Sequence, residues 1–481
     1  MILSTLFSQA GILVSSPLPE LDITAIVTDS RRTVPGCLFV AVRGTKADGN
    51  SFAQTALDQG AAAILTDCPR CSAMPGRILV DSVASSLGPL LRVFHGAPDQ
   101  GMKVFGVTGT NGKTTTAFLV EAMLEEAGFK PALLSTVSNR WPGFQSDAVM
   151  TTPDSVILWE NLAKASQAGA RSLAMEVSSH ALHQERVAGL LFDAVVFTNL
   201  TRDHLDYHGS YENYFAAKSR LFTRHLKADA CPVVNLDDAH GRILKRQMKH
   251  RVLGFSFDAP DADYRIQDLS LSLTGLSFRL EGRGHSLELK SPLLGRVFAQ
   301  NLAGAAIAAL GMGVSPEAIV RACARLSVPG RCELVHVGDL TGIVDYAHTP
   351  DALERLLEGL RPLVPGRLIC VFGCGGDRDR GKRPLMGEIA ARLSDLAIVT
   401  SDNPRSEDPG AIVDEIISGI SMGNCERMVD RLEAIRHASR GLRPGDLVVI
   451  AGKGHEKTQT IAGVSHAFDD AQVLRCALEV V

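Results

Sequence analysis

Short apolar runs alternate with helix-type patterns along almost the whole chain. Runs at 103–107, 194–198, 367–372, 396–400 and 447–451 are continuous enough to predict buried strands. Strands that alternate with helical segments are typical of domains in which parallel strands are joined by crossover helices. The pattern therefore predicts an α/β fold with mainly parallel sheets.

Two interruptions of this pattern divide the chain. A length of 481 residues corresponds to about three domains. One break is predicted at 94–99, just before an apolar run, and the other at 326–330, where Pro329 and Gly330 interrupt a helical stretch. The predicted segments are 1–97, 98–328 and 329–481.

Composition and charge exclude several classes of protein. Hydrophobic residues make up 45% of the chain, the net charge is -4, and no basic block indicates a nucleic-acid partner. The first basic residue is Arg31, so a secretory signal is not expected, and the apolar stretch 303–314 is too short to span a membrane. We expect a cytoplasmic protein without a membrane partner. The ten cysteines, including the pair Cys68 and Cys71, are expected to be free thiols, because no second pair follows at zinc spacing.

A glycine-rich turn after the run at 103–107 is the strongest local signal of chemistry. The sequence Gly109-Thr-Asn-Gly-Lys-Thr-Thr115 precedes a helical pattern that Gly128 should end. Backbone N–H groups of such a turn surround a phosphate, the lysine reaches the outer phosphates and the first threonine binds Mg²⁺. The first glycine of a standard phosphate loop is replaced by Val107. A simple glycine turn is the alternative.

Six motifs occur here in one order, and together they resemble the Mur ligase family. They are the phosphate loop, Met175-Glu-Val-Ser-Ser-His180, Thr198-Asn-Leu-Thr-Arg-Asp-His-Leu-Asp-Tyr-His208, Ala217-Lys218, Asp345-Tyr-Ala-His348 and Ala451-Gly-Lys-Gly-His-Glu456. The resemblance implies a central P-loop-type domain with a parallel sheet. It also implies an N-terminal α/β domain for a uridine nucleotide and a C-terminal Rossmann-like α/β domain for an amino acid.

The resemblance implies that ATP phosphorylates a peptide carboxylate and that an amine then attacks the acyl phosphate. Positioning and charge stabilisation carry such chemistry, with Mg²⁺ neutralising the phosphates. The implied catalytic residues and magnesium ligands are Thr114, Glu176, His204 and a carbamylated Lys218, together with the catalytic Lys113. The residues alone leave open a surface acid at 176, a loop-capping histidine at 204 and a solvated lysine at 218.

The same resemblance assigns two groups of binding residues. For ATP they are Gly109, Thr110, Asn111, Gly112, Lys113, Thr114, Thr115, Asn301, Arg331, Asp345 and His348. For the UDP-MurNAc-L-Ala-D-Glu substrate they are Thr28, Ser30, Thr45, Lys46, Ala47, Thr151, Thr152, Ser178, Gln184 and Arg186. Helix capping is the alternative for Asn301, and ordinary turn chemistry is the alternative in the first segment.

The third segment is expected to select the amino acid. The implied residues are Arg378, Asp402, Asn403, Pro404, Arg405, Gly452 and Glu456. In this family Asp-Asn-Pro-Arg accompanies meso-diaminopimelate rather than lysine. Arg405 can bind the extra carboxylate with two hydrogen bonds, whereas a lysine substrate would leave it unpaired. A salt bridge within its loop is the alternative for Arg378.

Other functions remain open from the sequence. A lysine-adding ligase of the same family and a ligase similar to folylpolyglutamate synthetase share the ATP chemistry. A regulator that binds nucleotide without catalysis is the alternative outside enzymes, although Lys113, Glu176, His204 and Lys218 are all present. Small molecules are the expected partners, and the expected state is a monomer.

Overall fold

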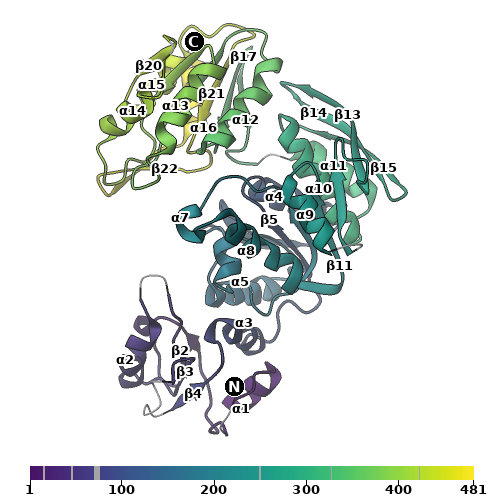
Figure 1. Cartoon of the computed structure of the whole chain (residues 1–481), viewed down its shortest axis with the longest axis vertical. Helices are drawn as coiled ribbons and strands as arrows, with labels where there is room; N and C mark the ends of the chain where they lie inside the picture. Colours follow the sequence, from purple (N-terminus) through teal and green to yellow (C-terminus); the bar gives the residue numbers. More distant parts are fainter. Residues whose placement is uncertain are drawn as a thin grey trace.

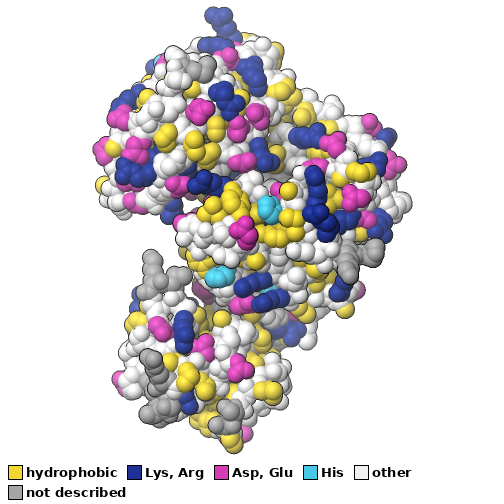
Figure 2. Space-filling model, viewed as in Figure 1, with side chains coloured by type: hydrophobic (Ala, Val, Ile, Leu, Met, Phe, Trp, Pro, Cys, Tyr) yellow, Lys and Arg dark blue, Asp and Glu magenta, His cyan; other side chains and the backbone are white. Residues whose placement is uncertain are grey.

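The computed structural model describes residues 1–14, 17–44, 47–69, 76–248, 251–326, 328–421 and 423–480. Three sheets follow one another from the N-terminal to the C-terminal part of the chain, and each carries its own helices (Figure 1). Thr45, Lys46 and Cys71 lie outside the described residues. Positive and negative side chains are mixed over the face seen in Figure 2.

The N-terminal part is a four-stranded parallel sheet in the order β1-β2-β3-β4. Its strands are β1 (Ile26–Val27), β2 (Leu38–Val40), β3 (Ala63–Thr66) and β4 (Arg77–Leu79). Its helices are α1 (Leu3–Gln9), α2 (Ala53–Asp58) and α3 (Val83–Phe94), with 3₁₀ turns η1 (Ser30–Arg32) and η2 (Gly49–Phe52). Because β1 and β2 are parallel neighbours, the loops that follow them meet at one edge of the sheet.

An eleven-stranded sheet forms the central part, in the order β15-β14-β13-β12-β11-β10-β5-β9-β6-β7-β8. Its strands are β5 (Lys103–Thr108), β6 (Pro131–Leu134), β7 (Ser138–Trp141), β8 (Phe144–Asp147), β9 (Ser172–Glu176), β10 (Phe192–Phe197), β11 (Leu226–Asn235), β12 (Leu253–Ser256), β13 (Tyr264–Ser272), β14 (Gly275–Gly282) and β15 (His285–Ser291). Its helices are α4 (Lys113–Glu126), α5 (Ser155–Gln167), α6 (Ser179–His183), α7 (Leu205–His208), α8 (Tyr211–Arg224), α9 (Ala239–Met248), α10 (Arg296–Gly311) and α11 (Pro316–Arg325).

The two ends of the central sheet differ from the mainly parallel sheet that the sequence predicts. The seven adjacent strands β13, β12, β11, β10, β5, β9 and β6 pair in parallel. At the two ends of the sheet, β7 and β8 and also β14 and β15 pair antiparallel. Residues 264–291 alternate buried and exposed positions, which suits strands with one wet face. These strands were absent from the predicted set because alternation over short windows is a weak signal.

The C-terminal part is a six-stranded sheet in the order β16-β17-β21-β18-β19-β20, and only β16 is antiparallel. Its strands are β16 (Glu333–Val337), β17 (Leu340–Asp345), β18 (Leu368–Phe372), β19 (Leu396–Val399), β20 (Cys425–Arg427) and β21 (Leu447–Ala451), with the hairpin β22 (Thr458–Ile461) and β23 (Val464–Ala467). Its helices are α12 (Pro350–Leu360), α13 (Lys382–Leu393), α14 (Pro409–Ile417), α15 (Arg431–Ser439) and α16 (Asp470–Glu479), with the 3₁₀ turn η5 (Arg361–Leu363).

The five predicted strands are confirmed. In chain order the apolar runs form β5, β10, β18, β19 and β21, and the observed ends differ from the predicted ends by at most two residues. All five strands are mostly buried. They lie in the parallel parts of the two larger sheets, where both faces are covered. Their continuous apolar character is therefore the signature of burial on both faces.

The first sheet and the central sheet share one apolar core. Phe7 and Leu38 belong to the same buried cluster as Trp159 and Phe192. Helix α3 packs tightly against the central part, because a Cβ at Gly88 would collide with the backbone of Ala188. This contact requires glycine and seats α3 against the central part.

We expect Gly88→Ala and Gly359→Ala to change stability in opposite directions. A methyl group at Gly88 must push α3 away from Ala188, which should lower the free energy of unfolding by about 1–3 kcal/mol. Gly359 in α12 has open space around its Cβ position, so alanine there should raise it by about 0.5–1 kcal/mol. Thermal and denaturant unfolding of both variants measure the difference, and equal stability of the two would contradict the contact.

Candidate active site

The phosphate loop joins β5 to α4 and needs both of its glycines. Gly109 and Gly112 have φ angles of 153° and 84°, in the region that favours glycine. A Cβ at Gly109 would collide with the Thr198 hydroxyl, and one at Gly112 would collide with the Asn301 side chain. Val107, where a standard loop has glycine, lies inside β5 and is buried. The departure therefore falls in the strand, outside the turn.

Two lysines share one acceptor inside this loop. The Lys113 ammonium donates to the carbonyl oxygens of Gly109 and Thr110 at 3.0 and 2.8 Å, and the Lys218 ammonium donates to the Gly109 oxygen at 2.7 Å. Lys218 is only 1% exposed. Burial, followed by the neighbouring Lys113 charge, holds the pKa of Lys218 well below its usual range. Burial also lowers the pKa of Lys113, against the opposing charges of Glu176 and Asp203.

Lys218 is therefore not the solvated lysine that its sequence context allows. It lies on α8, one helical turn after Tyr214, and its nitrogen is 4.5 Å from the centre of that ring. The Tyr214 hydroxyl lies 3.1 Å from the Thr110 hydroxyl in the loop. Sequence reasoning missed Tyr214, although an aromatic residue four positions before a lysine in a predicted helix is a detectable signal.

Glu176 ends β9 next to the end of β5, since Val107 pairs with Glu176. Its Oε1 accepts a hydrogen bond from the Thr136 backbone N–H at 2.7 Å. Its Oε2 is buried and has no hydrogen-bond partner among the described residues. A surface acid is thus the wrong interpretation. An unpaired buried carboxylate oxygen is costly, and a cation bound there would remove the cost.

The residues around Glu176 fit a magnesium ion that is held mainly by substrate. Across the described ranges, no three His, Cys, Asp or Glu side chains converge on one point. Mg²⁺ is commonly held by one or two carboxylates together with substrate phosphates and water. The hydroxyl of Thr114, the other predicted ligand near the loop, accepts from the Arg331 guanidinium at 3.1 Å.

His204 has a left-handed backbone with a φ of 52° and occupies the N-cap position of α7. Its side chain makes no capping hydrogen bond, so the alternative of a loop-capping histidine is wrong. Its ring nitrogen Nε2 lies 3.4 Å from Asp203, and its ring is 4.8 Å from that of His180. Burial lowers the pKa of His204 and leaves the imidazole neutral, the form that binds metals. Burial also lowers the pKa of His180 to about 4, with His204 as the next cause.

Arg331 connects the C-terminal part to the phosphate loop through its bond to Thr114. The Asn111 side chain makes a second connection, donating to Asp351 of α12 at 3.2 Å. Asp345 accepts the backbone N–H groups of Cys332 and Ala347 at 2.7 and 2.8 Å. Burial raises the pKa of this carboxyl.

Of the other two predicted ATP residues, only Asn301 is in contact with the same loop in the described part of the chain. The His348 ring lies 2.9 Å from the Tyr346 carbonyl oxygen, just after β17. Asn301 lies inside α10 rather than at its start, because Gly295 is the N-cap of that helix. The capping interpretation of Asn301 is therefore wrong, and its side chain packs against Gly112.

Five of the ten residues predicted to bind the UDP-muropeptide form one connected group beside Glu176. Arg186 donates to the Gln184 side chain at 2.7 and 2.9 Å and to the Thr152 carbonyl oxygen at 3.0 Å. The Thr152 hydroxyl accepts from the Ser178 N–H at 3.0 Å and donates to the Glu176 carbonyl oxygen at 2.9 Å. The Thr151 hydroxyl lies 3.1 Å from that of Thr136, whose N–H binds the Glu176 carboxylate.

The residues predicted for the uridine nucleotide follow β1 and β2. Thr28 comes directly after β1, and Ser30 begins η1, whose N-cap is Asp29. Ala47 accepts the Gly44 N–H through its carbonyl oxygen at 2.9 Å. Ordinary turn hydrogen bonds thus explain the conformation of some of these residues. They lie at the edge of the sheet where the parallel strands β1 and β2 end.

The residues predicted for the amino acid lie in loops that follow three adjacent strands. The loops after β18, β19 and β21 meet at one edge because these strands are parallel neighbours. Asn403 donates to the Glu456 carboxylate at 2.6 Å, and Arg405 donates to the Gly376 carbonyl oxygen at 2.7 Å. A Cβ at Gly452 would lie against the Asp402 carboxylate.

Arg378 is exposed and makes no hydrogen bond or ion pair with any described residue. A salt bridge within the loop is therefore the wrong interpretation for it. Its side chain and that of Arg405 both approach the Cβ position of Gly375, at 3.8 and 2.8 Å. Sequence reasoning missed Lys453, which is fully buried and donates to the Thr458 carbonyl oxygen at 2.5 Å beside Glu456.

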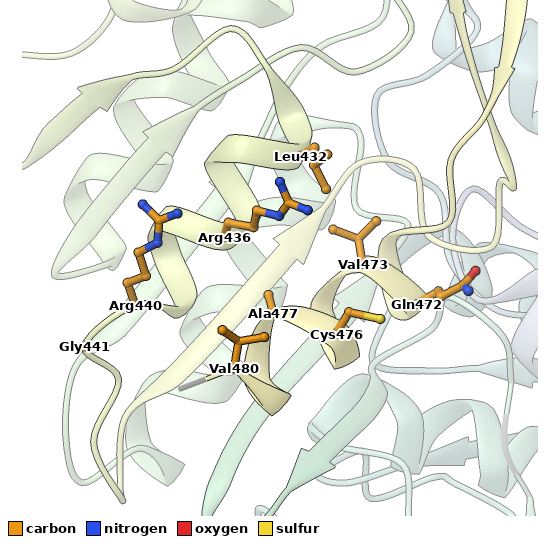
Figure 3. A pocket seen from close by; sticks show the side chains of 9 residues that line it. All are labelled: Leu432, Arg436, Arg440, Gly441, Gln472, Val473, Cys476, Ala477 and Val480. Carbon is orange, nitrogen blue, oxygen red and sulfur yellow. The ribbon is translucent and has the colours of Figure 1, made fainter.

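Two cavities lie away from the predicted residues. One, of about 670 Å³, lies between α15 and α16, with Arg436 and Arg440 on one side and Val473 and Cys476 on the other (Figure 3). The second, of about 440 Å³, is lined by polar groups that include Asp237 and Gln300. Neither is lined by a residue that the sequence assigns to the site. Among the described helices, none is both long and apolar enough to cross a membrane.

Comparison with known proteins decides the family. Residues 22–91 match the catalytic domain model of the Mur ligase family, 107–309 match the Mur ligase middle domain, and 330–454 match the Mur ligase glutamate ligase domain. A UDP-N-acetylmuramoyl-L-alanyl-D-glutamate–2,6-diaminopimelate ligase from Synechococcus elongatus is 46% identical over 473 residues, which cover 95% of this chain and 94% of that one. This chain belongs to the Mur ligase family. It is thus an ATP-dependent ligase that forms amide bonds.

Further relatives agree with this assignment. A ligase of the same name from Geobacter metallireducens is 43% identical and covers 95% of this chain and 94% of its own. A solved structure of a ligase with that name is 35% identical, with a TM-score of 0.74 and coverage of 100% and 99%. Folylpolyglutamate synthase from Mycobacterium tuberculosis is 18% identical, with a TM-score of 0.63 over 76% of this Mur ligase and 92% of its own chain, a likeness of fold alone. The predicted family and α/β architecture are confirmed.

Proposed function

We propose that this Mur ligase joins meso-diaminopimelate to UDP-MurNAc-L-Ala-D-Glu and forms UDP-MurNAc-tripeptide, ADP and phosphate for peptidoglycan synthesis. The observation that carries the choice of amino acid is the edge of the third sheet. There Arg378 and Arg405 approach one glycine, and Asn403 and Glu456 bind each other beside them. Cationic and anionic groups at one edge suit an amino acid with a second zwitterionic centre.

The central part would activate the peptide carboxylate. Lys113 and the N–H groups of its loop would bind the outer phosphates of ATP, with Arg331 reaching the same loop. Glu176, Thr114 and His204 would hold Mg²⁺, which neutralises the phosphates during transfer. Arg186, Thr152 and Ser178 would orient the muropeptide so that its carboxylate attacks the terminal phosphorus. The product of that step is an acyl phosphate and ADP.

The amine would then attack the acyl phosphate and release phosphate. Selectivity requires that the far carboxylate of the amino acid be paired. Arg405 offers two parallel N–H donors for that carboxylate, and the exposed Arg378 offers further donors. Lysine has no carboxylate there and would leave these donors without a partner, a mismatch that sites of this type reject strongly. Asp402, Pro404 and Gly452 shape the same edge.

We also propose that Lys218 reacts with CO2. Its lowered pKa supports this, since only the neutral amine is a nucleophile. The neutral amine forms an N–C bond to CO2 and loses one proton, which leaves an anionic carbamate on a side chain that is a cation when protonated. A carbamate next to Gly109 would attract Mg²⁺ and offset the positive charge of Lys113. The segment boundaries 97/98 and 328/329, the monomeric state and the cytoplasmic location stay predictions.

Phosphate release with purified enzyme tests the reaction. We expect release only when ATP, UDP-MurNAc-L-Ala-D-Glu and diaminopimelate are all present, with lysine giving a far smaller kcat/KM. Mass spectrometry of the product should detect the added diaminopimelate. Faster turnover with lysine would assign the lysine-adding function, and binding of ATP without any turnover would assign a regulatory one.

We expect Arg405→Ala to raise the KM for diaminopimelate by about tenfold to a hundredfold, because a paired carboxylate loses its charged hydrogen bonds. The KM for ATP should stay unchanged, since the phosphate loop lies in another part of the chain. Arg440→Ala, which removes an exposed arginine of the same part, is the matched control. Unchanged diaminopimelate kinetics in Arg405→Ala would reject Arg405 as the carboxylate-binding group.

We expect Lys218→Ala to lose nearly all activity, and added formate or acetate to restore part of it by supplying an anion in the vacated space. The wild-type enzyme should lose activity when CO2 is removed from the buffer and regain it with bicarbonate. Steady-state rates measure both effects. A Lys218→Ala enzyme with wild-type rates would exclude the carbamate, because no anion would then be needed at this position.

A further inference from the structure

Two loops of the third sheet are tied together next to the amino-acid site. The loop after β18 carries Asp377 and Arg378, and the loop after β19 carries Arg405 and Ser406. Asp377 and Arg405 have left-handed φ angles of 54° and 53°, which non-glycine residues adopt at a cost. The surrounding contacts must therefore hold both loops in these conformations.

A buried arginine provides the central tie. Arg383 on α13 is 0% exposed and binds both oxygens of Glu407 at 2.9 and 3.0 Å. The Glu407 Oε1 atom also accepts the Asp377 N–H at 2.6 Å. The carboxylate thus fastens the first loop to the second through one side chain, and it follows Arg405 by only two residues. Arg383 also donates to Glu415 at 2.7 Å.

Further bonds close the gap between the loops. The Ser406 hydroxyl donates to Asp377 at 2.5 Å, and the Gly376 N–H donates to the Asn403 carbonyl oxygen at 2.9 Å. The Arg405 guanidinium donates back to the Gly376 carbonyl oxygen. This network therefore ties together the two loops that carry the exposed Arg378 and the half-buried Arg405, with the buried Arg383 at one end.

We propose that Arg383 and Glu407 are positioning residues that hold Arg378 and Arg405 at the spacing of one substrate carboxylate and thereby set the preference for diaminopimelate over lysine. This inference rests on the function proposed above. Arg383 is fully buried and Glu407 is bound to it, so neither is assigned a contact with the substrate. They act by aligning the two arginines that would bind the far carboxylate.

Arg383 has a second, electrostatic consequence. Glu407 is close in sequence to Arg405, and a free carboxylate there would compete with the substrate carboxylate for Arg378 and Arg405. The hydrogen bonds from Arg383, and then the Asp377 N–H, hold the pKa of Glu407 at about 2, so its charge is present and already paired. Arg378 and the remaining N–H groups of Arg405 are thus left for the substrate carboxylate.

Glu407→Gln separates this role from general stability. Both Glu407 oxygens accept hydrogen bonds, so an isosteric amide must set an N–H donor against another donor at one of them. We expect the KM for diaminopimelate to rise about tenfold or more, with kcat and the KM for ATP nearly unchanged. The ratio of kcat/KM for diaminopimelate over lysine should fall by a similar factor. Ser406→Ala, which removes one exposed tie, should give a smaller change in the same direction.

Asp446→Asn is the matched control. Asp446 also binds an arginine, Arg367, at 2.7 and 3.0 Å and accepts a backbone N–H, but it precedes β21 at the opposite edge of the same sheet. The Asp446→Asn variant should lower the melting temperature as much as Glu407→Gln does, without changing the preference for diaminopimelate over lysine. An unchanged preference in Glu407→Gln and Ser406→Ala, with normal wild-type turnover, would overturn the positioning role. Absence of diaminopimelate addition by the wild type would instead overturn the proposed function.

Discussion

The carbonyl oxygen of Gly109 is the point on which the catalytic arrangement depends, because two lysines from different elements donate to it. Lys113 begins the helix after the loop, and Lys218 reaches it from α8. Burial, and after it the nearby charge of Lys113, holds the pKa of Lys218 well below its usual range. The fold thus brings two lysine amines of lowered pKa to one carbonyl oxygen. A left-handed glycine is needed at 109 because the Thr198 hydroxyl occupies the space where a Cβ would lie.

Parallel sheets bring together residues that are far apart in the sequence. Glu176 and the phosphate loop meet because β9 and β5 are neighbours, and the loops after β18, β19 and β21 meet for the same reason. In each sheet, polar side chains therefore lie together in the loops at the carboxyl ends of the parallel strands. The residues within these strands are mostly apolar. Arg331 and Asn111 connect two of these edges through Thr114 and Asp351. A ligase that must hold a nucleotide and two further substrates can thus be built by joining such edges along one chain.

The sequence was enough to predict the parallel strands and the candidate residues in the loops. It was not enough to predict which distant residues contact one another. Continuous apolar runs identified β5, β10, β18, β19 and β21, because strands covered on both faces need no polar positions. The antiparallel ends of the central sheet escaped detection, since their alternation is short and resembles that of loops. Asn301 was placed at the start of its helix but lies inside α10, because helix starts are set by local glycine and turn geometry that propensity does not resolve.

The missed partners share one physical feature, which is that burial gives them their role. Arg383 and Lys453 look like surface cations in the sequence, and only the folded chain makes them fully buried. A buried cation must be paired, so each of them orders the acid next to it, Glu407 for Arg383 and Glu456 for Lys453. The Glu176 Oε2 atom is the opposite case, a buried acceptor with no partner among the described residues. Paired buried cations thus fix the geometry of the amino-acid edge, and the unpaired Glu176 oxygen is an acceptor that the proposed magnesium ion would satisfy.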